Sequence, residues 1–177
     1  LEGKYKLKWA APWGPNAWIT YLGREWSRTK DAVYVRLPAT VYDALVDRVG
    51  GGGRKAVSPG LPPNEGRVDA TEPLDEQQSA LFRSCVGLIM WAMMVRIDIQ
   101  YVAKELARKV QAPTGSCMLA LKRLVRYFAG TRDHCFEIRL DPAAAEANLH
   151  GVTDAAWASD PCRRSTSGGV VRCRSMV

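Results

Sequence analysis

The sequence has few of the residues that build metal centres or disulfide frameworks. Its histidines are His134 and His150, and its five cysteines show no C-x-x-C spacing. A structural zinc site takes four Cys or His ligands at close spacings, so zinc binding is not expected. An odd number of cysteines without paired spacing is typical of reduced thiols. We therefore expect an intracellular protein, in the cytoplasm or the nucleus.

Long apolar runs, an N-terminal signal pattern and glycine-rich phosphate loops are also absent from the sequence. The longest apolar run, residues 85–95, has 11 residues, whereas a helix needs roughly 20 to cross a bilayer. No G-x-x-x-x-G-K-[ST] or G-x-G-x-x-G pattern occurs, which argues against a nucleotide site of either kind. We expect no membrane partner. The first residue is Leu1 rather than Met, which favours a fragment or a processed product.

Apolar residues and basic charge are what the sequence does contain. Hydrophobic residues make up 47% of the chain and six are Trp, so a folded core is expected rather than disorder. The net charge is +7, and residues 77–140 carry ten basic and four acidic side chains. Such a concentrated positive charge attracts phosphate backbones. A solvated helical surface is an equally good interpretation of the charge alone.

The hydrophobic spacing predicts an α+β protein. Residues 17–37 alternate and are broken by a polar turn at 27–31, which predicts a β-hairpin. Pro38 can occupy the first position of a helix that ends near Val49, with one apolar residue on every fourth position. Residues 54–75 hold four of the ten prolines and predict a linker.

Residues 77–131 predict three helices. The first begins near residue 76 and ends near 95, and Asp98 can cap a second helix that ends near Val110. The third, over 116–129, is amphipathic and has Gly130 as its expected stop. Its apolar stripe is Met118, Leu121, Val125 and Phe128, and its basic residues off that stripe are Lys122, Arg123 and Arg126. Strands are predicted over 135–140, 148–154 and 168–174.

Five separated motifs resemble one known family. They are R83-S-C-V-G-L-I-M-W, R96-I-D-I-Q-Y-V-A-K-E-L, A120-L-K-R-L-V-R-Y-F-A-G-T-R-D, V-T-D-A-A-W-A-S-D at 152–160 and R-R-S-T-S-G at 163–168. Their order and spacing resemble the polymerase region of copia-type (Ty1-like) LTR retrotransposon polyproteins, over about residues 17–174. The chain departs from the family pattern at Ile97, where the family has proline, and at Ala156, where it has a second aspartate.

The resemblance implies a domain assignment. Residues 1–60 would be the end of a reverse transcriptase palm with its hairpin and the start of the thumb, and 61–76 a linker. Residues 77–134 would be the helical thumb and connection, and 135–177 the first strands of a truncated ribonuclease H-like α/β domain. The parent protein would be an RNA-directed DNA polymerase that also hydrolyses RNA–DNA hybrids. The polymerase aspartates and most ribonuclease H carboxylates are missing from the chain, which leaves its own enzymatic activity open.

Asp154 matches the first ribonuclease H carboxylate of the family, and the resemblance implies a catalytic role as a Mg²⁺ ligand. Two-metal hydrolysis needs several convergent carboxylates. We therefore expect Mg²⁺ in the complete parent enzyme but none on this chain alone. Without the resemblance, a local hydrogen bond at a strand end would be the preferred interpretation of Asp154. Trp157 is interpreted as a packing residue.

The basic residues of the third helix are the best candidates for nucleic-acid contacts. The resemblance implies that Lys122, Arg123 and Arg126 lie along the backbone of a primer–template or an RNA–DNA hybrid. Arg163 and Arg164 are further candidates, although a solvated loop is equally plausible. The other expected partner is the remainder of the retroelement polyprotein. Two alternatives stay open: a non-catalytic nucleic-acid-binding module retained by a host, and a degenerate product without function.

Overall fold

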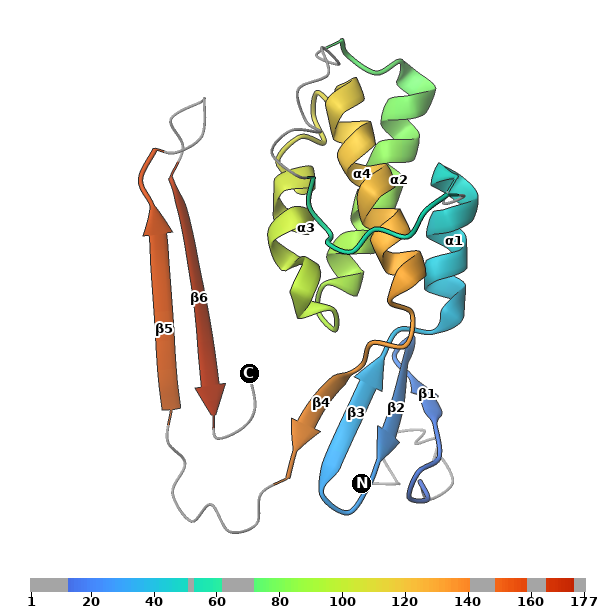
Figure 1. Cartoon of the computed structure of the whole chain (residues 1–177), viewed down its shortest axis with the longest axis vertical. Helices are drawn as coiled ribbons and strands as arrows, with labels where there is room; N and C mark the ends of the chain where they lie inside the picture. The colour runs from blue at the N-terminus through green and yellow to red at the C-terminus, as the bar shows by residue number, and fades with distance from the viewer. Residues whose placement is uncertain (1–12, 51–52, 62–71, 141–148, 159–164, 174–177) are drawn as a thin grey trace, which may run out of the picture. The chain divides into compact units, whose positions relative to one another are not determined.

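A computed structural model describes residues 13–50, 53–61, 72–140, 149–158 and 165–173 of the chain. These residues form a mixture of helices and strands, as expected for an α+β protein (Figure 1). The chain divides into two compact units. One unit contains Leu1–Ala17, Ser27–Tyr34 and Glu137–Val177, and the other contains Trp18–Trp26 and Val35–Phe136. Within the described residues, no helix has the length and apolar character needed to span a membrane.

Four strands form one sheet in the order β1-β2-β3-β4. They are β1 Ile19–Tyr21, β2 Arg24–Arg28, β3 Ala32–Arg36 and β4 Phe136–Arg139. β1 and β2 are antiparallel and are joined at Leu22 and Gly23, which both have positive φ angles. This geometry matches the twist of a two-residue hairpin turn. The sequence predicts a single hairpin here. The structure has two successive turns instead.

The second turn is shorter than expected. The hydroxyl of Thr29 accepts hydrogen bonds from the backbone N–H groups of Asp31 and Ala32, at 3.3 and 3.0 Å. This local bonding closes the turn after β2. Ser27, which the sequence places in the turn, therefore lies in β2, where it is buried.

The first helix agrees with its predicted apolar stripe. α1 spans Ala39–Val49 and buries Val41, Leu45 and Val49. Pro38 precedes the helix as its N-cap, with φ −65° and ψ 150°, rather than occupying the first helical position. Gly50 ends it in the left-handed region at φ 75°, and its N–H donates to the carbonyl of Val46. Glycine adopts this conformation without steric cost, which explains the abrupt end.

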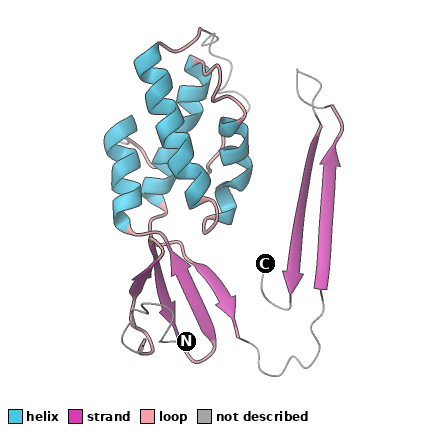
Figure 2. Cartoon of the chain, turned by 180° about the vertical axis from the view of Figure 1, so that it is seen from behind, coloured by secondary structure: helices cyan, strands magenta, loops and turns pink. Residues whose placement is uncertain are grey.

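The remaining helices are α2 Glu76–Ala92, the 3₁₀ turn η1 Ile97–Ile99, α3 Gln100–Ala107 and α4 Gly115–Gly130. Asp75 caps α2, since its Oδ1 accepts from the N–H of Gln78 at 2.7 Å. α2 and α4 lie between α1 and α3 (Figure 2). The helices bury a shared apolar core that includes Leu45, Phe82, Ile89, Ile99, Leu121, Leu124, Val125 and Phe128.

Three predicted details of these helices are wrong. Asp98 does not cap a helix, because it lies inside η1 and its carboxylate is bound by Arg96 and Tyr127. α2 and α3 each end three residues earlier than predicted. Gly130 is the last residue of α4 rather than a left-handed stop.

Two further strands form a separate antiparallel hairpin. β5 spans Leu149–Ala156 and β6 spans Thr166–Cys173, with Asp154 opposite Gly168. Both were expected from the sequence. β4 pairs within the sheet of β1, β2 and β3 rather than with β5 or β6. The assignment of residues 135–177 to one ribonuclease H-like domain stays a prediction.

Candidate nucleic-acid interface

α4 separates an apolar stripe from a basic one. Leu121, Val125 and Phe128 are fully buried, as the helical spacing predicts. Lys122 is exposed, and Arg123 and Arg126 are half-buried. Because residues three and four positions apart lie on the same side of a helix, Arg126 lies near both Lys122 and Arg123. The structure thus brings these three candidates together on one helix.

A short segment completes this basic surface. Residues 53–61 follow α1 and cross α4 (Figure 1). The segment and α4 together form an open pocket of about 250 Å³, lined by Arg54, Lys55, Ala56, Val57, Arg123 and Arg126. We call it the basic pocket. Arg123 also donates to the hydroxyl of Ser58 in the same segment, at 3.2 Å. Arg54 and Lys55 are missed by the sequence reasoning, which treats them as part of a linker.

Glycine allows the segment to approach α4 closely. A Cβ atom added at Gly130 would lie 3.2 Å from the Cβ of Lys55, tighter than ordinary van der Waals contact. A Cβ added at Gly60 would lie 3.7 Å from a methyl carbon of Val102 on α3. The segment is therefore held against two helices. Close approach to Lys55 explains the glycine at the end of α4, where the sequence suggests a helix stop.

The basic pocket has unbalanced charge. Of the six described residues that line it, four are Lys or Arg and none is acidic. The Nε atom of Arg126 is buried and has no hydrogen-bond partner among the described residues. Like charges gathered in a partly desolvated site repel each other, and an anion there would offset that repulsion. Guanidinium groups match the oxygens of phosphate especially well, because they donate two parallel hydrogen bonds.

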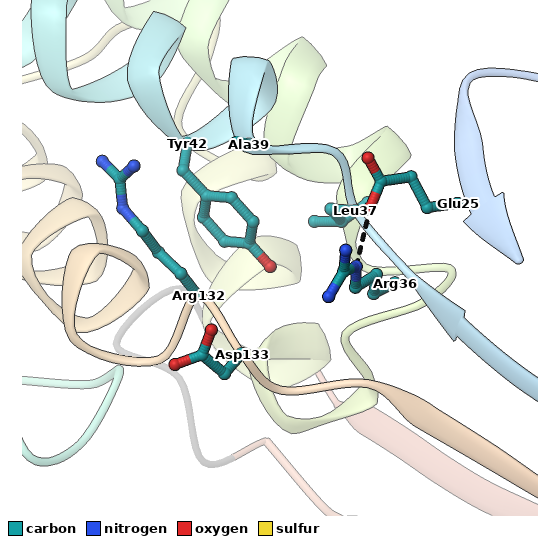
Figure 3. Close-up of a pocket in the computed structure, with 7 residues that line it drawn as sticks. All are labelled: Glu25, Arg36, Leu37, Ala39, Tyr42, Arg132 and Asp133. Carbon is teal, nitrogen blue, oxygen red and sulfur yellow. Dashed lines mark hydrogen bonds and ion pairs between the residues drawn. The ribbon is translucent and has the colours of Figure 1, made fainter. Parts of the chain in front are cut away.

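A second pocket of about 240 Å³ has balanced charge instead. It lies beside Tyr42 and is lined also by Glu25, Arg36, Leu37, Ala39, Arg132 and Asp133 (Figure 3). Nε of Arg36 donates to Glu25 at 2.6 Å, and Arg132 pairs with Asp43 at 2.6 Å. Because each arginine already has an acidic partner, this pocket is the poorer candidate for an anion.

The most deeply buried charge belongs to Arg96, whose side chain is 2% exposed. Its Nε and Nη2 donate to the two carboxylate oxygens of Asp98, at 2.9 and 2.7 Å. It also donates to the carbonyl and hydroxyl oxygens of Thr131 and to the hydroxyl of Tyr42. Tyr127 donates its hydroxyl to Asp98 at 2.7 Å. These five residues form the buried network, which joins α1, η1 and α4.

The hydrogen bonds of the buried network favour the charged forms of Asp98 and Arg96. Burial alone would raise the pKa of Asp98, but hydrogen bonds from Arg96 and Tyr127 hold that pKa below its usual value. Burial alone would lower the pKa of Arg96, but hydrogen bonding to Asp98 and Tyr42 raises it. Burial raises the pKa of Tyr42 and of Tyr127. The network is internally satisfied, so its role is to hold helices together.

Asp154 stands apart from other ligand-type side chains. It is exposed on β5, and its Oδ1 accepts from the N–H of Ala155 at 2.8 Å. The opposite residue, Gly168, offers no side chain. No group of three or more His, Cys, Asp or Glu side chains suited to a metal exists in the part of the chain that the structure describes. These residues therefore do not provide the several carboxylates that a Mg²⁺ pair requires.

The structure treats the other residues singled out in the sequence in different ways. Arg163 and Arg164 lie outside the described residues, so their role stays a prediction. Trp157, interpreted from the sequence as a packing residue, is 88% exposed, and that interpretation is wrong for this structure. Cys85, Cys117 and Cys135 are free thiols in the structure, and the reduced state of the chain stays a prediction.

Comparison with known proteins gives partial sequence matches. The chain is 34% identical over 79 residues to the retrovirus-related Pol polyproteins from transposons RE1 and RE2 of Arabidopsis thaliana. The match covers 45% of this chain and 5% of each polyprotein. An uncharacterized mitochondrial protein of the same plant is 33% identical over 88 residues, which cover 49% of this chain and 35% of that protein.

A secreted RxLR effector protein 161 of Plasmopara viticola is 38% identical over 89 residues, or 49% of this chain and 61% of that protein. The chain thus spans less than two thirds of the length of each of these relatives. No protein-family description and no solved structure matches the sequence. The similarity to the transposon proteins supports a retrotransposon polyprotein as the context of this chain.

Proposed function

We propose that the chain is part of the reverse transcriptase and ribonuclease H region of a copia-type retrotransposon polyprotein. Within it, α4 and residues 53–61 bind the phosphate backbone of an RNA–DNA hybrid or primer–template. The observation that carries the proposal is the basic pocket. Two cationic side chains from the segment and two from α4 line it, and no acidic residue lines it in the part of the chain that the structure describes. The cytoplasm or the nucleus, where such nucleic acids occur, is the proposed location.

Backbone binding of this kind has a measurable signature. Contacts to phosphates position a protein without reading sequence. Each neutralised phosphate releases condensed counterions, so log K falls with log salt at a slope of about −0.9 per contact on duplex DNA. With about four contacts, affinity would fall roughly 100-fold between 50 and 200 mM salt. A hybrid of any base composition should bind similarly.

The test is fluorescence anisotropy of a labelled RNA–DNA hybrid titrated with the purified chain at 50–200 mM KCl. In the triple variant Lys122→Ala, Arg123→Ala, Arg126→Ala, we expect the slope to be shallower by about two to three units. The control variant Lys30→Ala, Lys109→Ala removes exposed lysines that do not line the basic pocket and should change the slope by less than about one unit. An unchanged slope in the triple variant would contradict the proposal.

Catalysis by this chain alone is not part of the proposed function. Asp154 is the one carboxylate that the resemblance assigns to ribonuclease H within these 177 residues, and one carboxylate does not hold two Mg²⁺ ions. The purified chain with a labelled hybrid and MgCl₂ should therefore give no cleavage, and Asp154→Asn should behave like the unaltered chain. Magnesium-dependent cleavage that disappears in Asp154→Asn would show that the site is complete.

A further inference from the structure

We propose that the basic pocket is a discrete site for one phosphate oxyanion, with preference for a dianionic phosphate over an internal phosphodiester. This inference refines the proposed backbone contact, and its biological ligand rests on that function. It also assigns a role to Arg54 and Lys55, which the family resemblance does not mark. Terminal phosphates of nucleic acids and inorganic phosphate share the required chemistry.

The pocket lies between elements that contact each other. Residues 53–61 contact the end of α4 at Gly130 and reach Val102 of α3 at Gly60. Arg123 is anchored to Ser58 by a 3.2 Å hydrogen bond. The guanidinium group of Arg123 is thus positioned before any ligand arrives, whereas Arg54 and Lys55 are exposed on the segment. Preorganised donors bind more tightly than donors on mobile side chains, because less conformational freedom is lost on binding.

The chemistry of the donors selects a phosphate. Arg54, Arg123 and Arg126 offer planar guanidinium groups that can each bridge two oxygens, and Lys55 adds a compact ammonium. The buried Nε of Arg126 has no hydrogen-bond partner among the described residues. Buried N–H groups are usually satisfied.

The charge of the pocket favours a dianion. A phosphate monoester carries about −1.5 to −2 charges at pH 7, whereas an internal phosphodiester carries one. Among the described residues, no carboxylate lines the pocket to oppose either anion. A terminal phosphate also meets fewer steric constraints in a pocket than a phosphate with nucleotides on both sides. The preference should therefore run from inorganic phosphate and terminal phosphate down to internal phosphodiester.

The experiment is isothermal titration calorimetry of the purified chain at constant ionic strength. The titrants are inorganic phosphate and a short oligonucleotide with or without a 5′-phosphate. We expect saturable one-site binding of phosphate, and tighter binding of the 5′-phosphorylated oligonucleotide than of its unphosphorylated form. The variants Arg126→Gln and Arg54→Gln should each weaken phosphate binding by about tenfold. Lys109→Gln, which removes an exposed charge elsewhere, should leave the dissociation constant unchanged.

A variant that keeps every charge separates geometry from net charge. Gly130→Ala adds a methyl group 3.2 Å from the Cβ of Lys55 and should displace the segment while favouring the helix. We expect weaker phosphate binding with an intact circular dichroism spectrum. Absence of phosphate binding, or equal binding by the chain, Arg126→Gln and Arg54→Gln, would overturn the proposal.

The two proposals can fail separately. Salt-dependent hybrid binding without phosphate binding would overturn the discrete site and leave backbone binding in place. Phosphate binding without hybrid binding would overturn backbone binding and leave a site for free phosphate. Equal affinity for oligonucleotides with and without the 5′-phosphate would overturn the preference for a dianion.

Discussion

Replacing Asp98 with asparagine should destabilise the chain through the buried network. The change keeps the size of the side chain but removes the negative charge that faces Arg96. Arg96 is only 2% exposed, so water cannot solvate its charge in place of the carboxylate. Tyr127 also loses a charged acceptor for its hydroxyl, now at 2.7 Å from Asp98.

The expected loss of stability depends on how deeply each partner of the ion pair, Arg96 and Asp98, is buried. Removing one partner of a buried ion pair typically costs about 3–5 kcal/mol. The side chain of Asp98 is 33% exposed, and the asparagine oxygen can still accept one hydrogen bond. We therefore expect a loss of about 2–3 kcal/mol in the free energy of unfolding. For a chain of this size the melting temperature would fall by roughly 5–10 °C.

Urea and thermal unfolding followed by circular dichroism would measure this loss. Asp133→Asn is the matched control, since Asp133 is exposed and its replacement should change stability by less than about 0.5 kcal/mol. If Asp98→Asn and Asp133→Asn lose the same small amount, the buried network does not stabilise the helices and the reasoning is refuted.

The pH dependence gives an independent check. The folded chain holds the pKa of Asp98 below its usual value, which is about 3.9 in unfolded peptides. The stabilisation is therefore fully present above that pH and is lost as the pH falls through the folded pKa. The stability difference between the unaltered chain and Asp98→Asn should be large at pH 7 and should shrink below about pH 3.9.

Two further predictions concern packing and the first turn. Leu121→Ala removes a fully buried side chain and should cost about 3 kcal/mol in urea unfolding, against less than about 1 kcal/mol for the partly exposed Leu119→Ala. Gly23→Ala places a Cβ 3.3 Å from the Trp91 ring at φ +72° and should cost about 1–2 kcal/mol. Its control, Gly14→Ala, has open space around the added Cβ and should be nearly neutral. Equal losses of stability for Leu121→Ala and Leu119→Ala, or for Gly23→Ala and Gly14→Ala, would contradict the reasoning.

Local patterns in the sequence predict the helices well. Val41, Leu45 and Val49 recur at every fourth position, and all three are buried in α1. Leu121 and Phe128 likewise lie on the buried side of α4. Such spacing predicts the buried side of a helix because a helix repeats every 3.6 residues, whichever element packs against it.

Contacts between distant segments could not be predicted in this way. An aspartate before an apolar helical stretch has the pattern of a cap, yet Asp98 binds Tyr127, which is 29 residues away. Arg54 and Lys55 have the local composition of a linker, and their role depends on the approach of α4. Arg96, Asp98 and residues 127–131 all lie in motifs that carry the resemblance. Their contact in the buried network depends on the tertiary fold, which no local pattern indicates.

The two halves of the basic pocket come from segments far apart in the chain, around Lys55 and Arg126. A partly folded state with helical α4 but an undocked segment would lack half of the cationic groups. Anion affinity should therefore report on docked tertiary structure rather than on helix content. By linkage, a ligand at a hundred times its dissociation constant would stabilise the native state by about 2.7 kcal/mol. Phosphate buffer would then act as a folding ligand for this chain.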